Sequence, residues 1–395
     1  MKLLIVAFSA SIHTARWINQ IIDQGWEVQL FSSSDSGATN RELKDIRIYH
    51  TFYGRKHNRN KKVKLIGVPV LSTNLAFGLR LLLRTCFPRY QQRYLCKVIK
   101  KFKPDMIHSM EFQHSAYLVS EVKKSWKGSF PKWIATNWGS DIYWFSRFPK
   151  EKTKIEEILR QCDYYSCDCQ RDVYLAQKHG LKGKILSVLP GPGGLDLKKI
   201  KSWRKPLAQR KIIMLKGYHD VWGRALVGIQ ALKLCASEIK SYTIIIYSVS
   251  PRSPVITAVA KFEKHTGIKV KTIAHNISHE QILKLHGRAR LSIGLSVSDG
   301  LSNSFLEAMV MGSFPIQSNT SCANEWVESG KTGMIVPPED PQVIEKAIRR
   351  ALTDDKLVDE ASKQNWKTAQ KRLDSKIIKK QIISYYNLVL NDEDK

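Results

Sequence analysis

Two acidic side chains, Asp299 and Glu307, stand eight residues apart in the segment that runs from 296 to 340. Asp299 lies in a turn after an apolar strand pattern, and Glu307 lies in a helix pattern whose N-cap would be Ser302 or Asn303. Carboxylates accept hydrogen bonds from paired hydroxyls, and a helix N-terminus offers N–H groups to a phosphate. The spacing therefore suits a nucleotide or sugar site. Taken alone, however, it fits a turn residue followed by an acid that complements the helix dipole somewhat better.

These residues depend on the elements that position them, and short apolar runs alternate with helical patterns along the chain. Runs without in-and-out alternation are typical of parallel strands covered on both faces. A turn-rich LPGPGGLD segment at 189–196 separates two such series, so we predict an α/β fold with two doubly wound domains, 1–196 and 197–372. The predicted strands are 2–8, 27–32, 105–108, 133–136, 164–167, 185–189, 212–216, 243–247, 269–273, 291–294, 315–317 and 334–336.

Two common nucleotide-binding signatures are missing from the sequence. The turn after the first strand reads SASIHT (9–14), which lacks the GxGxxG of dinucleotide-binding domains, and no GxxxxGK[ST] segment occurs. These absences argue against NAD-binding and P-loop proteins. Ligands of doubly wound sheets bind at the carboxyl ends of the strands, so the cleft between two such domains is the expected site.

The segment 296–340 resembles the donor-binding region of retaining GT-B-fold glycosyltransferases of the family 4 type. The similarity also includes the stretches 12–21, 103–111, 138–142, 189–196 and 277–300, so it extends over nearly the whole chain. It implies two Rossmann-like domains facing across a cleft, with a last helix, 373–395, crossing back to the first domain. The matching positions of the donor region are Asp299, Glu307-Ala308-Met309, Gly312, Pro315-Ile316, Glu325 and GKTG at 330–333.

The resemblance implies a role for each residue of this region, with a UDP- or GDP-sugar as co-substrate. Glu307 would bind the ribose hydroxyls, and Asp299 would contact the transferred sugar. Family members usually carry Glu at the position of Asp299, so the reach here is shorter by about 1.5 Å. Turn amides would face the diphosphate; they belong to Gly300, Leu301, Ser302 and Asn303.

The same resemblance points to a pair of cations beside the leaving diphosphate. In the segment MLKGYHDVWGRAL (214–226), Lys216 ends a predicted strand and Arg224 begins a helix, although the family's usual order of Gly-Arg before Lys-Gly is not kept. A guanidinium and an ammonium can both stabilise phosphate charge as it develops. Lys216 can also be read as an ordinary charge at a strand end.

Three residues are candidates for the acceptor side of the reaction. His13 and Asp141 follow strands of the N-terminal domain, and His114 follows a third; each also has a structural reading, Asp141 as a helix cap. Trp138 stands where many relatives carry a histidine, so no general base is carried over. The resemblance implies front-side attack assisted by the leaving phosphate. The only Asp-x-Asp, at 392–394, lies in the charged tail, so we expect no metal requirement.

The charge of the chain is its abnormal feature, because 64 Lys and Arg against 35 Asp and Glu give a net charge of +29. Between residues 46 and 104 there are 15 Lys or Arg and no acidic residue. Such a balance indicates a polyanionic partner, namely nucleic acid, an anionic membrane surface or phosphorylated ligands. No recognised nucleic-acid module is present, so we expect no nucleic-acid partner.

The segment 73–103 predicts two amphipathic helices after a basic loop at 54–64. We expect both apolar stripes to pack on the N-terminal sheet, while the loop and the basic face dock on an anionic membrane. The stripes are Leu75, Leu79, Leu82, Leu83 and Cys86, then Tyr90, Tyr94, Leu95, Val98, Ile99 and Phe102; the basic face is Arg89, Arg93, Lys97, Lys100 and Lys101.

Together these features predict a cytoplasmic glycosyltransferase, peripheral at the inner leaflet, that moves a hexose-type sugar to a lipid-linked or surface-glycan acceptor. The apolar run 65–79 is too short for a span. Seven cysteines without CxxC spacing favour reduced, structural thiols over a metal site. Two alternatives stay open: a basic nucleic-acid-binding protein, and a non-catalytic GT-B-like sugar-nucleotide binder.

Overall fold

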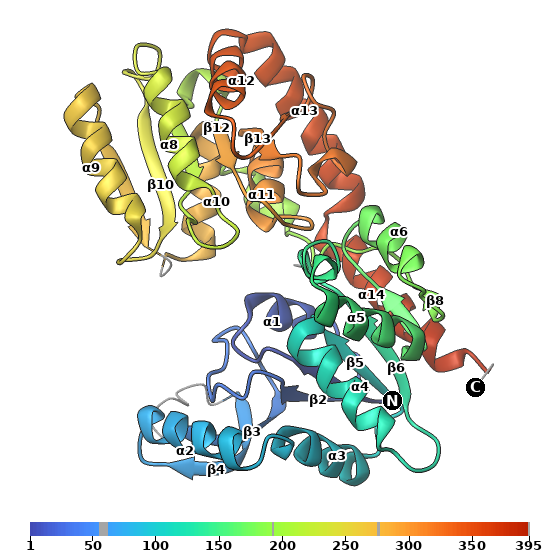
Figure 1. Ribbon diagram of the computed structural model, residues 1–395. Helices are drawn as coiled ribbons and strands as arrows, with labels where there is room; N and C mark the ends of the chain where they lie inside the picture. The colour runs from blue at the N-terminus through green and yellow to red at the C-terminus, as the bar shows by residue number, and fades with distance from the viewer. Residues whose placement is uncertain (55–61, 192, 275–276, 394–395) are drawn as a thin grey trace. The chain divides into compact units, whose positions relative to one another are not determined.

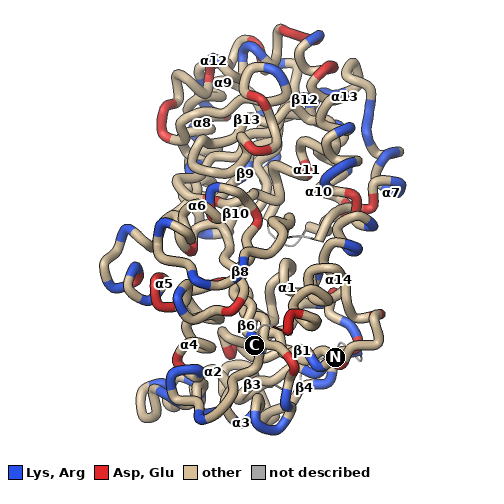
Figure 2. Tube along the Cα trace, turned by 90° about the vertical axis from the view of Figure 1, so that its right-hand side faces the viewer, with Lys and Arg blue, Asp and Glu red and all other residues tan. Residues whose placement is uncertain are grey.

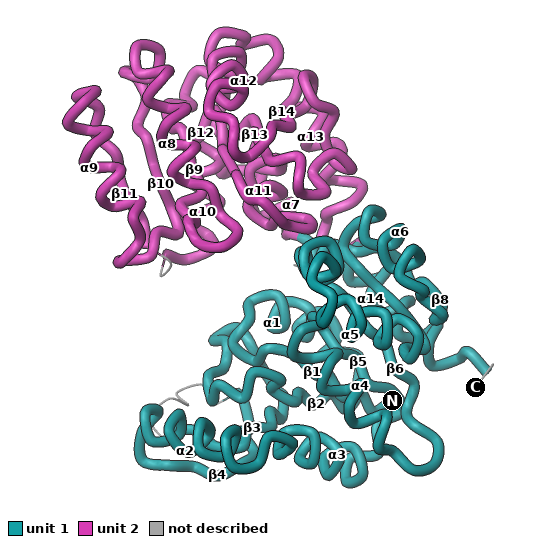
Figure 3. The backbone as a smooth tube through the Cα atoms, viewed as in Figure 1, with its two compact units in different colours: residues 1–194, 378–395 teal, residues 195–377 magenta. Residues whose placement is uncertain are grey.

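The computed structural model describes residues 1–54, 62–191, 193–274 and 277–393. The chain forms two compact units, one made of 1–194 with 378–395 and the other of 195–377 (Figure 3). Each unit is an α/β domain with its own parallel sheet and its own cores. The two units are described separately below.

The first unit is built on an eight-stranded parallel sheet with the order β4-β3-β2-β1-β5-β6-β7-β8 (Figure 1). The chain moves outward from β1 to β4 and then returns beside β1 with β5, which is the doubly wound pattern. The strands are β1 (Lys2–Ala7), β2 (Glu27–Ser32), β3 (Ile46–Gly54), β4 (Val63–Val70), β5 (Met106–Met110), β6 (Lys132–Thr136), β7 (Tyr164–Ser166) and β8 (Lys184–Ile185).

Helices cover both faces of this sheet and create two separate apolar cores. The core on one face takes side chains from α1 and α14, and the core on the other takes them from α3, α4, α5 and α6. The helices are α1 (Ile12–Asn19), α2 (Thr73–Cys86), α3 (Tyr90–Phe102), η2 (Phe112–Ala116), α4 (Tyr117–Lys124), η3 (Phe145–Arg147), α5 (Pro149–Gln161), α6 (Gln170–Lys178) and α14 (Ser375–Asn391).

The late helix α14 is joined to the first unit by a buried chain of hydrogen bonds. The Tyr386 hydroxyl accepts from Trp17 Nε1 at 2.8 Å and lies 2.6 Å from His108 Nδ1, while His108 Nε2 lies 2.7 Å from Thr136 Oγ1. All four side chains are buried, and the hydrogen bonds between them take the place of the bonds to water that these polar atoms lose on folding. Burial lowers the pKa of His108 to about 3.

The second unit has a six-stranded parallel sheet with the order β11-β10-β9-β12-β13-β14. Its strands are β9 (Ile212–Lys216), β10 (Thr243–Val249), β11 (Val270–Ala274), β12 (Ala289–Gly294), β13 (Phe314–Ser318) and β14 (Met334–Val336). The helices are α7 (Leu197–Lys201), η4 (Leu207–Gln209), α8 (Ala225–Leu234), α9 (Pro254–Thr266), α10 (His279–Arg288), α11 (Asn303–Met311), η5 (Ala323–Glu325), α12 (Pro341–Thr353) and α13 (Asp355–Arg372).

The α/β fold is confirmed, and each of the twelve predicted strands overlaps a strand of the structure, although the predicted strand 185–189 shares only Ile185 with β8. Three predicted strands have the bounds of the structure, namely Glu27–Ser32, Ile212–Lys216 and Met334–Val336. Strands β3 and β4 were not predicted, because their part of the chain was interpreted by its basic charge. Helix α13 was missed as well, since polar residues dominate its sequence, DKLVDEASKQNWKTAQKR. The predicted loop 54–64 lies mostly outside the described residues.

The two predicted amphipathic helices behave differently. Helix α3 buries its apolar stripe, as expected, through Leu95, Val98, Ile99 and Phe102. Helix α2 does the reverse, so the prediction that its stripe packs on the sheet is wrong. Its buried residues are Ala76 and Arg80. Seven large apolar side chains of α2 and its flanks are exposed: Val68 at 52%, Leu71 at 74%, Leu75 at 46%, Phe77 at 63%, Leu81 at 55%, Leu82 at 59% and Phe87 at 57%.

The reason for the turned helix is an inward-pointing arginine. Arg80 donates from Nη1 to the carbonyl of Phe52 at 2.8 Å, and its charge lies near the buried Asp35. Asp35 in turn accepts from the backbone N–H of Thr51 at 2.8 Å and from the Tyr90 hydroxyl at 3.1 Å. A buried carboxylate requires such partners, so this polar contact fixes which side of α2 faces the domain and leaves the apolar side outward.

Two further sequence predictions can be compared with the structure. Within the described part of the chain, no helix combines the length and apolar character needed to cross a lipid bilayer. The prediction of reduced thiols holds for five of the seven cysteines, which are free: Cys86, Cys96, Cys162, Cys167 and Cys235.

Candidate functional site

The second unit reverses its strand order between β9 and β12. From β9 the chain moves outward to β10 and β11, and then it returns on the other side of β9 with β12. Two loops that diverge from neighbouring parallel strands at such a point leave room for a ligand at their carboxyl ends. Lys216 ends β9, and the segment with Asp299 follows β12.

These two loops are tied together by their backbones. Gly223 forms an antiparallel bridge with Ser296, and the N–H of Val297 donates to the Trp222 carbonyl at 2.9 Å. The turn after β9 needs Gly223, because a Cβ there would lie 2.2 Å from the Tyr218 carbonyl oxygen. The turn after β9 and the loop after β12 thus form one rim of the site.

The loop 299–303 leads directly into α11, whose N-cap is Ser302, one of the two predicted caps. Ser302 makes no side-chain cap bond to the helix; its hydroxyl lies 3.0 Å from that of Ser304. The Gly300 carbonyl accepts from the N–H of Cys322 at 3.0 Å, which anchors the loop to the segment after β13. Asn303 is the first residue of the helix, and Leu301, within the loop, is buried. This start of α11 can receive an anion.

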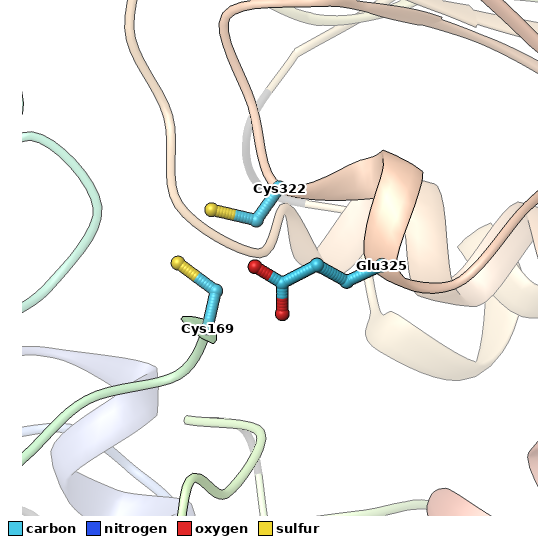
Figure 4. A group of neighbouring side chains, drawn as sticks. All are labelled: Cys169, Cys322 and Glu325. Atoms are coloured by element: carbon cyan, nitrogen blue, oxygen red, sulfur yellow. The ribbon is translucent and has the colours of Figure 1, made fainter. Parts of the chain in front are cut away.

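The anchoring segment after β13 also carries a residue of the donor-region resemblance, Glu325. Cys322 precedes η5 and Glu325 ends it, and both side chains extend from the same side of this short helix (Figure 4). The carbonyl of Glu325 accepts from Arg372 at 2.7 Å, which joins η5 to the end of α13. Through the hydrogen bond from Cys322 to Gly300, this segment holds the loop 299–303 in place.

Glu307 lies in the second turn of α11 with 8% of its surface exposed. Its Oε1 is 2.7 Å from Nε2 of His279, the first residue of α10. Two buried groups lie nearby, His286 and Tyr247, with ring centroids 5.6 Å apart. Burial lowers the pKa of His286 to about 4 and raises the pKa of Tyr247, and the charge of Glu307 acts on both. The sequence had not predicted that His279 and His286 lie close to Glu307.

The predicted cations lie at the same edge of the sheet. Arg224 caps α8 and donates from Nε to Oε1 of Glu339 at 2.8 Å and from Nη1 to the Gly223 carbonyl at 3.0 Å. The Lys216 ammonium lies over the Tyr218 ring, 4.7 Å from its centroid. Asp299 is partly exposed in the loop opposite. The structure therefore brings Lys216 and Arg224 to the rim formed with the Asp299 loop.

The first unit gathers its predicted residues at the carboxyl edge of β1, β5 and β6. Glu111, directly after β5, has a φ of 81°, a strained value for a side chain other than glycine. Its carboxylate accepts from the N–H groups of His114 and Ser115 and lies 3.1 Å from Nδ1 of His114. That hydrogen bond raises the pKa of His114, whose side chain is 55% exposed. The edge of Phe8 lies against the same imidazole, with centroids 5.0 Å apart.

Asp141 has a different environment from the two histidines. It is 5% exposed, and its Oδ2 accepts from the N–H groups of Trp138 at 2.7 Å and Phe112 at 2.9 Å. Burial, helped by the charge of Glu111, raises its pKa well above the usual range. The imidazole of His13 lies 5.5 Å from the Trp138 ring. Asp141 thus holds two loops in place, which favours a positioning role over the predicted contact with an acceptor.

One cavity of the first unit includes His114. It has a volume of about 460 Å³ and is lined by Arg84, Tyr117 and Lys154 as well as by polar side chains of α3, α4 and α5. Three donors at the start of α6, Asp168, Cys169 and Asp172, come within 4.8 Å of one another. Asp172, however, already accepts from Arg171 and Asn137, each at 2.8 Å, so this cluster is a structural ion pair rather than a metal site.

Comparisons with known proteins connect this geometry to a family. Residues 257–369 match the model of glycosyl transferases group 1, and residues 2–70 and 88–169 match the model of glycosyl transferase 4-like proteins. The structure is similar to sucrose-phosphate synthase from Thermosynechococcus elongatus, with a TM-score of 0.73 and 15% identity over 98% of this chain and 99% of that one. The chain is a family 4-like glycosyltransferase of the GT-B fold.

Other solved structures agree with this fold. The glycosyltransferase is similar to HepE from Anabaena, solved with UDP-glucose, with a TM-score of 0.68 and 13% identity over 98% of this chain and 99% of that one. It is also similar to a glycosyltransferase from Rickettsia africae, with a TM-score of 0.65 and 15% identity over 99% of each chain. No curated protein matches the glycosyltransferase by sequence.

Proposed function

We propose that this glycosyltransferase moves a hexose-type sugar, with retention, from a UDP- or GDP-sugar to a lipid-linked or surface-glycan acceptor. The observation that carries the proposal is the position of Glu307, which lies at the switch point of the second unit just inside the start of α11. A diol-binding carboxylate beside an anion-binding helix start suits a nucleoside diphosphate. The complex of HepE with UDP-glucose supports a nucleotide-sugar donor.

Each candidate site residue of the second unit then has a role. Glu307 binds the ribose hydroxyls, the amides of 300–303 hold the diphosphate, and Asp299 contacts the transferred sugar. The bond from the sugar to the diphosphate breaks while the acceptor oxygen bonds to the same face of that sugar. The acceptor proton passes to a leaving phosphate oxygen. Arg224 and Lys216 stabilise the charge that develops there, and the mechanism needs no metal ion.

On the acceptor side we assign contacts to His13 and His114. His114 carries a raised pKa and a half-exposed ring, so it can donate a hydrogen bond to an acceptor hydroxyl or to an anionic group. Asp141 acts through the loops of Trp138 and Phe112. The strained backbone of Glu111 holds His114 in this position, which is how such strain is commonly used.

The donor assignment is tested by thermal shift with UDP, GDP and UDP-glucose. We expect one of the nucleotides to raise the melting temperature of the wild-type enzyme by mass action, and Glu307→Ala to remove most of that shift. The matched control is Glu328→Ala, since Glu328 is an exposed acid of the same unit paired only locally with Lys331. An equal shift in Glu307→Ala and wild type would contradict the assignment.

Turnover separates the enzyme from its alternatives. A non-catalytic binder would show the thermal shift and no release of UDP or GDP from any sugar donor. A nucleic-acid-binding protein would give a salt-sensitive gel shift instead. We expect the wild-type enzyme to release UDP or GDP from its sugar donor, and we expect the rate of this release to fall in Arg224→Ala.

We further propose that the enzyme works in the cytoplasm at the inner leaflet, with α2 as the element that docks. Its apolar side is exposed, and the helix lies in a stretch with 15 Lys or Arg and no acidic residue from 46 to 104. Lys and Arg recur along α2 and α3 (Figure 2). Exposed apolar side chains in a basic segment suit an anionic bilayer. The apolar side chains partition into the membrane interface, and the basic side chains attract the anionic headgroups. Flotation with anionic and with zwitterionic vesicles tests this; equal recovery with both would contradict it.

A further inference from the structure

His279 is placed over the carboxylate of Glu307. Its Nε2 is 2.7 Å from Oε1 of Glu307, and the side chain of His279 is 30% exposed while that of Glu307 is 11% exposed. The imidazole therefore lies at the rim, and the carboxylate lies deeper. A ligand that approaches Glu307 from solvent meets this histidine on its way.

The backbone of His279 is fixed by the way in which α10 begins. Ser278 and Gln281 form a reciprocal capping box, with the Ser278 hydroxyl accepting from the Gln281 N–H and the Gln281 side chain accepting from the Ser278 N–H. Such a box satisfies two helix donors and holds the first turn in place. The imidazole is thus presented to Glu307 from a rigid element.

Two other polar groups near Glu307, His286 and Tyr247, are held elsewhere or are deeper. His286, seven residues further along α10, lies with Nδ1 at 2.9 Å from the Ser292 hydroxyl, which itself is 2.7 Å from that of Ser313. Tyr247 packs edge-on against His286 in the core. His279, in contrast, lies at hydrogen-bond distance from the carboxylate. A charge-assisted bond of this length restricts the rotamer of Glu307.

We propose that His279 is a positioning residue for nucleoside recognition, which holds Oε1 of Glu307 so that the carboxylate meets both ribose hydroxyls. This rests on the function proposed above, in which Glu307 binds the ribose. A carboxylate oxygen has two lone pairs, so Oε1 can accept from His279 and from one hydroxyl while Oε2 accepts from the other. Without His279, binding has to order the Glu307 side chain as well.

The test measures the Kd for UDP and for GDP by calorimetry in a set of variants. We expect His279→Ala to weaken nucleotide binding about tenfold or more, since hydrogen bonds to charged groups are among the stronger ones. His279→Gln, whose amide nitrogen reaches the position of Nε2, should restore most of the affinity, and the shorter His279→Asn should not. His265→Ala, at the exposed end of α9, is the matched control. Unchanged binding in His279→Ala, or a Gln variant as weak as Ala, would overturn the proposal.

A readout without ligand separates this inference from the proposed function. In urea unfolding, the shifts in midpoint caused by His279→Ala and Glu307→Ala should add to more than the shift of the double variant, because each single change removes the same bond. Additive shifts would refute the pairing. Non-additive shifts in an enzyme that binds neither UDP nor GDP would refute the nucleoside-binding function and leave only a structural pair.

Discussion

The outward apolar side of α2 gives a prediction whose size follows from the structure. The variant combines Phe77→Ser, Leu81→Ser and Leu82→Ser, three positions with exposed fractions of 63%, 55% and 59%. Complete burial of such a side chain contributes about 1.5–3 kcal/mol, and somewhat more than half of each surface is available. The three together should therefore contribute about 4 kcal/mol to partition into a bilayer interface.

A loss of that size lowers the partition coefficient for anionic vesicles roughly a thousandfold, since each 1.4 kcal/mol is a factor of ten. The measurement is sedimentation with vesicles of graded anionic content, which gives the coefficient directly. Folding should change by less than about 0.5 kcal/mol, because these side chains contribute little to the core. Far-UV circular dichroism and the melting temperature check that.

The control changes exposed apolar residues of the same unit that lie outside the acid-free stretch. Tyr174 on α6 is 64% exposed and Leu388 on α14 is 54% exposed, so Tyr174→Ser with Leu388→Ser removes two exposed side chains of the same kind, against three in the α2 variant. Its vesicle binding should equal that of the wild type. If the α2 variant and this control bind vesicles equally well, the exposed side of α2 is not a docking element.

Three further predictions follow from individual contacts. Arg80→Leu should lower the free energy of unfolding by about 3 kcal/mol, measured in urea, because Asp35 loses its compensating charge in the interior. His286→Asn should remove an acid sensitivity: the wild-type histidine, with a folded pKa of about 4, costs stability as pH falls from 6.5 toward 4, since only the unfolded chain takes up the proton. Melting curves across that range should be flatter for the variant. Arg224→Ala should lower kcat by about a hundredfold in a nucleotide-release assay, as expected for a group that stabilises the leaving charge, while loss of its partner in Glu339→Ala should leave kcat within threefold.

The alternating fold could be predicted from the sequence because buried parallel strands leave continuous apolar runs. Ile212–Lys216 reads IIMLK, and its bounds were predicted to the residue. The strand β4 could not be found in the same way, since its sequence, VKLIGVPV, lies at the edge of the sheet and is mostly exposed. Helix α2 was predicted as a helix but not in its orientation, because a hydrophobic stripe gives no sign of a buried arginine opposite it.

In the candidate site, features that depend on neighbouring residues could be predicted, and contacts between residues far apart in the sequence could not. The N-cap Ser302 and the placement of Glu307 on the following helix could be predicted, because both depend on neighbours in the sequence. The contact between His279 and Glu307 joins residues 28 positions apart through the packing of α10 against α11, which no spacing rule gives. The burial of Asp141 likewise depends on how its own loop meets the loop of Phe112, so its positioning role emerges only from the structure.

The bond between Trp17 and Tyr386 has a consequence for how the protein is made. During synthesis the strands and the first helix of the first unit leave the ribosome long before α14 does, so the face of the sheet around Trp17 and His108 stays uncovered while the whole second unit is translated. The second unit can complete its core as soon as its own residues have emerged. Nascent chains should therefore acquire protease resistance in residues 195–377 before residues 1–194, an order opposite to that of most multidomain proteins.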